Sequence, residues 1–210
     1  ELDHLYLGRN FNDSDIEKEL TKYKLHFVKS ENISHDIALA LADGKVVARF
    51  NGAMEYGPRA LGNRSIIYSA KDKSVNEWLN KRLNRTEFMP FAPFVRDIDY
   101  KDFFEIEEKQ VHPFKFMTIT CNVTDKCKVE APAISHVDGT ARPQIVYRET
   151  NASYYDILTE YKKITGYSVL VNTSFNMHEE PIINTPEEAI KTFQLGGLDI
   201  LAIGNYIVTH

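Results

Sequence analysis

The segment Glu55-Tyr-Gly-Pro-Arg-Ala-Leu-Gly-Asn-Arg-Ser65 concentrates the side chains with the clearest chemical potential in the sequence. Arg59 and Arg64 carry planar guanidinium groups that match phosphate oxygens, and Asn63 adds a neutral donor. Gly62 lets the backbone approach a ligand because it has no Cβ. The segment lacks a Walker-type glycine–lysine pattern, so it is not a P-loop. It is either a phosphate-binding loop or a structural loop whose arginines pair with surface carboxylates.

A second polar segment is His136-Val-Asp-Gly-Thr-Ala-Arg142. Arg142 can bind an anion with Thr140 beside it, and Asp138 can help to hold Mg²⁺, which prefers oxygen ligands. His136 is more often a hydrogen-bonded structural residue than an acid or base. The alternative for the whole segment is an Asp-Gly turn with incidental polar neighbours.

A third segment, Asn172-Thr-Ser-Phe-Asn176, follows an expected apolar strand over residues 167–171. Ligands tend to sit at the carboxyl ends of strands in open α/β sheets. Asn172, Ser174 and Asn176 would supply amide and hydroxyl groups there. Because no His or acid is spaced as a partner for Ser174, a binding role is favoured over acyl-enzyme chemistry. A capped turn between elements is the alternative.

A fourth segment, from Arg82 to Pro93, holds Arg82 and Arg85 before the stiff run Pro90-Phe-Ala-Pro93. These residues either line a pocket or form a solvated helix face.

The elements that would position these segments alternate along the chain, which predicts a single mixed α/β domain. The most specific local signal is Thr185-Pro-Glu-Glu188, which predicts a capped helix start. Ser14-Asp-Ile-Glu17 has the capping-box pattern and predicts an earlier start. Helices are expected over residues 14–24, 34–42, 75–83, 153–165 and 185–196, strands over 45–50, 66–69, 114–120, 144–148, 167–171, 199–203 and 206–208, and a loop over 121–143.

The composition sets further bounds. The 210 residues carry a net charge of −5, so no global basic field supports nucleic-acid binding. No run of about 18 apolar residues spans a membrane, and no signal peptide is visible, so a cytoplasmic location is expected. Cys121 and Cys127 match no common zinc spacing, and no metal site is expected in these residues.

Several motifs in order give the chain a family resemblance. It resembles the carboxyl-terminal domain of the carbamoyltransferase family that includes nodulation-factor and antibiotic-pathway O-carbamoyltransferases. The resemblance covers about residues 35–208 and implies a YrdC-like α/β fold, a twisted sheet with flanking helices, over residues 1–210, with residues 1–34 as a lead-in helix and strand. The motifs are Met54–Ser65, Pro90–Pro93, His136–Arg142, Asn172–Asn176, Glu180-Pro181, Thr185-Pro186 and Gly197-Leu-Asp199.

The resemblance also implies an activity. In such enzymes this domain joins ATP and carbamoyl phosphate, with Mg²⁺, to give carbamoyl-adenylate and pyrophosphate. A separate amino-terminal Kae1-like domain of the same polypeptide, which carries a metal expected to be Fe²⁺, then transfers the carbamoyl group to a hydroxyl. Nothing in these residues resembles that second domain, so half of an enzyme is expected. A homodimer is left open.

The family motifs assign roles to individual residues. Arg59, Arg142 and Ser174 match positions that look like carbamoyl-phosphate and nucleotide ligands, and Ser174-Phe-Asn176 looks like the Ser-x-Asn signature of YrdC proteins. The wider set expected at the nucleotide comprises Asn63, Arg64, Arg85, Asp138, Thr140, Asn172 and Asn176.

One segment departs from the family pattern. A family lysine falls on Leu83 or Asn84 here, and a family arginine falls on Met89, so Arg82 or Arg85 would have to compensate. Two alternatives therefore stay open. One is a non-catalytic nucleotide-binding or assembly module, and the other is a YrdC-like RNA-associated protein, against which the acidic charge argues.

Overall fold

An eight-stranded mixed sheet forms the centre of the computed structural model, which describes residues 2–84 and 91–210. Its strand order is β1-β10-β9-β2-β3-β8-β4-β7. Strand β2 pairs in parallel with β9 and β4 with β7, and the other neighbouring pairs of this sheet are antiparallel. The strands are β1 (Phe27–Lys29), β2 (Val47–Phe50), β3 (Arg64–Ser69), β4 (Ala92–Arg96), β7 (Gln144–Val146), β8 (Val169–Ser174), β9 (Ile200–Ile203) and β10 (Tyr206–Val208).

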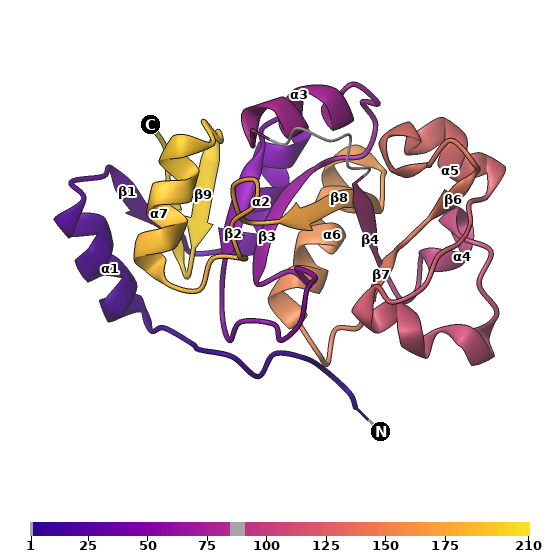
Figure 1. Cartoon of the computed structure of the whole chain (residues 1–210), viewed down its shortest axis with the longest axis horizontal. Helices are drawn as coiled ribbons and strands as arrows, with labels where there is room; N and C mark the ends of the chain where they lie inside the picture. The colour runs from indigo at the N-terminus through magenta and orange to yellow at the C-terminus, as the bar shows by residue number, and fades with distance from the viewer. Residues whose placement is uncertain (1, 85–90) are drawn as a thin grey trace.

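Helices cover both faces of this sheet (Figure 1). Successive side chains of a strand point to opposite faces. Val47 and Ile67 pack with α2 and α6 on one face, while Ala48 and Ile66 pack with α1, α3 and α7 on the other. Burial on both faces explains why these strands are continuous apolar runs. The helices are α1 (Asp13–Lys22), α2 (Ile33–Ala42), α3 (Val75–Arg82), α6 (Ala152–Thr165) and α7 (Pro186–Leu195).

The start of α7 confirms the expected cap. The Thr185 hydroxyl accepts from the Glu188 backbone N–H at 3.3 Å, and the Glu188 carboxylate accepts from the Thr185 N–H at 3.1 Å. The first helix also has a capping box, but its N-cap is Asn12 and its partner is Asp15, two residues before the expected Ser14. Asn caps as well as Ser does, and the pattern at Ser14 hid this earlier one.

The region between β4 and β7 differs most from expectation. The expected strand over 114–120 is instead a 3₁₀ helix, η2 (His112–Phe116), followed by Met117 at a positive φ of 55°. Phe114 and Met117 are both buried, and their three-residue spacing suits a 3₁₀ turn better than a strand. The expected loop over 121–143 contains α5 (Asp125–Glu130), η3 (Pro132–Ile134) and the paired strands β5 (Cys121–Asn122) and β6 (Thr140–Ala141). Figure 1 shows this region, with α4 (Tyr100–Phe103) and η1 (Glu108–Gln110), beside the central sheet.

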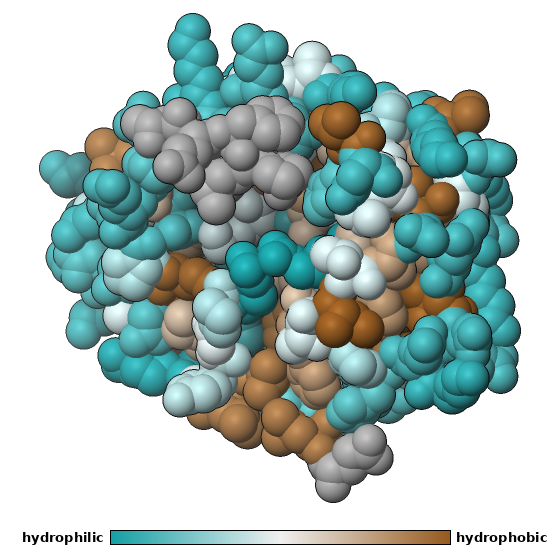
Figure 2. Space-filling model, turned by 45° about the vertical axis from the view of Figure 1, so that its right-hand side comes forward, coloured by the Kyte–Doolittle hydropathy of each residue, from teal (hydrophilic) through white to brown (hydrophobic). Residues whose placement is uncertain are grey.

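The amino-terminal residues run along the loop between β2 and β3. The Gly8 N–H donates to the Met54 carbonyl at 2.9 Å, and the Tyr56 N–H donates to the Leu5 carbonyl at 2.7 Å. Figure 1 places this segment along the lower edge of the molecule, and Figure 2 shows hydrophobic surface gathered there. None of the helices described for residues 2–84 and 91–210 is long and apolar enough to cross a membrane.

Candidate functional site

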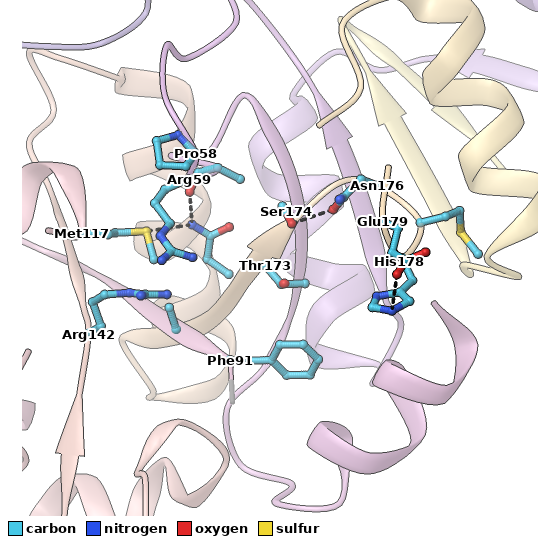
Figure 3. A pocket seen from close by; sticks show the side chains of 14 residues that line it. Pro58, Arg59, Phe91, Met117, Arg142, Thr173, Ser174, Asn176, His178 and Glu179 are labelled. Atoms are coloured by element: carbon cyan, nitrogen blue, oxygen red, sulfur yellow. Dashed lines mark hydrogen bonds and ion pairs between the residues drawn. The ribbon is translucent and has the colours of Figure 1, made fainter. Parts of the chain in front are cut away.

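A cavity of about 340 Å³ lies at the carboxyl end of β8 (Figure 3). It brings together the β2–β3 loop, the start of β4, the segment around β6 and the turn after β8. All four segments singled out in the sequence therefore contribute to one place, and the described part of the fourth does so through Phe91 and Ala92. The wall consists of Pro58, Arg59, Ala60, Phe91, Ala92, Met117, Arg142, Asn172, Thr173, Ser174, Asn176, Met177, His178 and Glu179.

Two arginines supply the positive charge of this cavity. Figure 3 shows the Arg59 and Arg142 side chains converging beside Met117. Burial, and secondly the nearby Arg59 guanidinium, lower the pKa of Arg142. The Arg142 Nε is buried without a hydrogen-bond partner in the described part of the chain. Two guanidiniums that repel each other make a site suited to an anion.

The loop that carries Arg59 is held from behind by Glu55, which is 2% exposed. The Glu55 Oε1 accepts three backbone hydrogen bonds, from Leu61 at 2.5 Å, Asn63 at 3.2 Å and Arg64 at 3.3 Å. Three donors on one carboxylate oxygen fold the loop around a fixed negative charge. No role for Glu55 was predicted from the sequence, in which the signal for one is a lone carboxylate in a loop rich in Gly and Arg.

The structure does not bring Asn63 and Arg64 into the cavity. Arg64 is fully buried, donates to the carbonyls of Asn51 and Gly52, and lies 3.7 Å from the Phe50 ring centroid. Asn63 accepts from the buried Arg49 at 3.0 Å and donates to the Ala53 carbonyl at 2.8 Å. Both side chains hold the loop in place and do not line the cavity, because their N–H groups donate to nearby backbone carbonyls.

The segment around His136 is brought to the cavity through Arg142 alone. Asp138 accepts from the Thr140 hydroxyl at 2.7 Å and from the Thr140 N–H at 3.0 Å, which closes the Asp-Gly turn. Neither residue lines the cavity. Burial lowers the pKa of His136. The described residues contain no group of three or more His, Cys, Asp or Glu side chains that could hold a metal ion.

Strand β8 extends three residues further than expected, so Asn172, Thr173 and Ser174 are strand residues. The Ser174 hydroxyl donates to Asn176 Oδ1 at 2.6 Å, and Asn176 Nδ2 donates to the Glu180 carbonyl at 2.6 Å. The Ser-x-Asn pair thus shapes the turn that follows the strand.

That turn adds a residue missed in the sequence. Figure 3 shows His178 across the cavity from the two arginines, with Thr173 between them. The neighbouring Glu179 has a positive φ of 62°, a conformation that non-glycine residues rarely adopt and that often occurs at functional sites. No pattern in the sequence distinguished this histidine from a surface residue.

The segment that departs from the family pattern, Arg82 to Pro93, supplies no positive side chain to the cavity from its described residues at the end of α3. Leu83 is fully buried in the core, and Arg82 forms an ion pair with Asp199 at 3.6 Å; neither Arg82 nor Asp199 lines the cavity. Arg85 and Met89 lie outside the described residues.

The comparisons with known proteins agree with this picture. The family model described as Carbamoyltransferase C-terminus matches residues 38–210. The chain is 36% identical to nodulation protein NolO from Bradyrhizobium diazoefficiens, over 99% of this chain and 38% of that protein. It is 37% identical to an uncharacterized protein from Methanocaldococcus jannaschii, over 99% of this chain and 34% of that protein. The chain thus spans about a third of the length of these relatives.

Solved structures show the same fold at low sequence identity. Full-length HypF in its phosphate- and nucleotide-bound form has a TM-score of 0.60 and 22% identity, and covers 85% of this chain and 22% of its own. Sua5 from P. abyssi in complex with L-threonine has a TM-score of 0.59 and 13% identity, and covers 82% of this chain and 46% of its own. By family model, relatives and fold, this chain belongs to the carbamoyltransferase family as its carboxyl-terminal, YrdC-like domain.

Proposed function

We propose that this domain binds ATP and carbamoyl phosphate in the cavity beside β8 and forms carbamoyl-adenylate. The carrying observation is the convergence of Arg59 and Arg142, neither of which has an ion-pair partner within the described residues. Two uncompensated guanidiniums at a strand end fit phosphate groups. The neighbour HypF, which shares the fold, was solved with phosphate and nucleotide bound, and this supports the proposal.

The reaction requires water as well as the two substrates. Water cleaves carbamoyl phosphate to carbamate and inorganic phosphate. A carbamate oxygen then attacks the α-phosphorus of ATP, a P–O bond forms, and the bond to the leaving pyrophosphate breaks. Negative charge develops on the transferring and leaving phosphates, where Arg59 and Arg142 would neutralise it. No protein nucleophile is needed, so most of the catalysis would be positioning.

The remaining wall residues would orient the substrates. Ser174, fixed by Asn176, and Thr173 place hydroxyl groups between the arginines and His178. Mg²⁺ would enter with the ATP phosphates, since Asp138 is occupied by Thr140. It would supply further charge neutralisation there.

The acceptor half of the reaction belongs to a larger protein. The relatives are about three times as long as this chain. Transfer to a hydroxyl would take place on an amino-terminal, Kae1-like, Fe²⁺-carrying domain of the same polypeptide. That domain would receive carbamoyl-adenylate from the cavity described above.

The proposal is tested by carbamoyl-phosphate-dependent release of pyrophosphate from ATP and by ATP–pyrophosphate exchange. Arg142→Ala should lower the rate at least about 100-fold, as expected for loss of a charge-stabilising group. Lys101→Ala, an exposed cation paired with Glu108, is the matched control and should leave the rate unchanged. Exchange that stays at background in the purified full-length protein contradicts the proposal.

A second candidate is a nucleotide-binding module without chemistry. It is favoured by the end of α3, where Leu83 is buried and Arg82 is paired with Asp199. A phosphate pocket with two arginines could bind ATP yet stabilise the transition state poorly. Saturable ATP binding without any pyrophosphate release would select this candidate over the first.

A further inference from the structure

One hydrogen-bond acceptor in the cavity wall has no partner among the described residues. Asn172 is 1% exposed, and its Nδ2 donates to the Ala60 carbonyl at 2.9 Å and to Gln144 Oε1 at 3.3 Å. Its Oδ1 is buried, and the described part of the chain offers it no hydrogen bond. Buried polar atoms in native proteins are nearly always paired, so an orphan at a cavity wall points to a ligand.

The orientation of this amide is fixed by its neighbours. Gln144 Nε2 donates to the Leu61 carbonyl at 2.9 Å, so the Gln144 oxygen faces Asn172. A flipped Asn172 would set its oxygen against two other oxygens. The unpaired atom of this wall residue is therefore the amide oxygen, an acceptor. Met117, an adaptable thioether that also lines the cavity, lies 3.9 Å from Asn172 Nδ2.

We propose that Asn172 Oδ1 accepts a hydrogen bond from the NH₂ group of the carbamoyl substrate and thereby selects carbamoyl over acyl groups of the same shape. This assignment rests on the proposed function. Fully ionised phosphate, carboxylate and carbonate oxygens are acceptors and cannot satisfy another acceptor, whereas a carbamoyl NH₂ is a donor and can. With the anionic end at Arg59 and Arg142, the NH₂ group is the part of the substrate that can meet Asn172.

A pair of ligands tests this directly. Acetyl phosphate keeps the phosphate and carbonyl of carbamoyl phosphate and replaces NH₂ by a methyl group. The wild-type protein should bind carbamoyl phosphate about 10- to 100-fold more tightly, because a site built for a donor leaves its acceptor unpaired with the methyl analogue. In Asn172→Leu, which keeps the side-chain shape, the ratio of the two dissociation constants should fall to about 1. Asn122→Leu is the matched control: it makes the same change at an exposed amide that does not line the cavity, and it should keep the ratio.

The outcomes distinguish a failure of the Asn172 assignment from a failure of the proposed function. Equal wild-type affinities for the two ligands overturn the assignment, whether or not Asn172→Leu folds. A ratio that survives in folded Asn172→Leu also overturns it, and leaves the proposed function intact. If carbamoyl phosphate neither binds the wild-type protein nor promotes pyrophosphate release, the proposed function falls and this assignment falls with it.

Discussion

Glu55 is a buried carboxylate that fixes the backbone of the β2–β3 loop and also carries a negative charge there. Its Oε1 gathers three backbone donors, and its Oε2 is buried without a partner among the described atoms. The guanidiniums of Arg49 and Arg64 lie nearby, and burial lowers the pKa of each to about 10, so both stay charged at pH 7. The carboxylate offsets part of their repulsion and fixes the path of the chain to Arg59.

Glu55→Gln distinguishes the effect of the charge from the effect of the loop's shape, because the two predict opposite changes in phosphate affinity. Removing a negative charge behind an anion site should tighten phosphate binding if charge alone mattered. We expect weaker binding instead, by about tenfold, together with a loss of about 1–3 kcal/mol in unfolding free energy, because the amide holds the three donors less well. Phosphate titration and urea unfolding measure both quantities. Glu77→Gln, on an exposed helix position, is the control, and tighter binding in Glu55→Gln would refute the positioning role.

Gly62 gives a second residue-scale prediction. Its φ is 116°, and a Cβ built there would lie 2.5 Å from Cδ1 of the buried Tyr154 ring. Gly62→Ala should therefore destabilise the fold by several kcal/mol, through both backbone strain and overlap. Gly57→Ala has a matching φ of 119° with nothing within 4 Å of its Cβ, so it should cost less. Equal midpoints of denaturation for the two variants would contradict the overlap argument.

Residue types predicted the location of the site better than they predicted which side chains reach it. Arg59, Arg142, Asn172, Ser174 and Asn176 were expected at the ligand, and all line the cavity. Asn63 and Arg64 have the same donor chemistry but face the carbonyls behind the loop. Inward or outward orientation depends on tertiary neighbours such as Glu55, and a loop has no periodicity from which to deduce it.

At the scale of elements, predictions held where the local signal and the packing agree. Helix α7 has cap, first-turn proline and apolar stripe in one segment, and its start matches to the residue. Residues 112–141 have only short 3₁₀ turns, a six-residue helix and two-residue strands, whose stability comes from tertiary contacts. Apolar and polar residues alternate only weakly in this sequence, so a strand and a loop were predicted where the chain forms short helices and short strands.

The α7 cap also makes a quantitative test. Thr185→Ala removes the acceptor for the Glu188 N–H and should lower the unfolding free energy by about 1 kcal/mol. Thr185→Ser keeps the acceptor and should cost much less. Guanidinium unfolding curves of the three proteins give the comparison. No residue of helix α7 lines the cavity, so phosphate affinity should change little.

At the scale of the whole molecule, one sheet carries both cores and the site. Clusters on its two faces share strands β2, β3, β8 and β9, so neither face can unfold without exposing the other. We expect a single cooperative thermal transition. The cavity uses the ends of β4 and β8 with the loop before β3, and ligand binding therefore stabilises the sheet as a unit.

A ligand at 100 times its dissociation constant adds about 2.7 kcal/mol to the stability of the native state. For a chain of this size that corresponds to a rise in Tm of about 5–10 °C. ATP should produce this shift in the wild-type protein, and the Arg59→Ala/Arg142→Ala double variant should lose it while keeping its own Tm near that of the ligand-free wild type. Loss of the two repelling guanidiniums removes no described ion pair, which is why the ligand-free variant should stay folded. A shift that persists in the double variant would place the nucleotide elsewhere on the molecule.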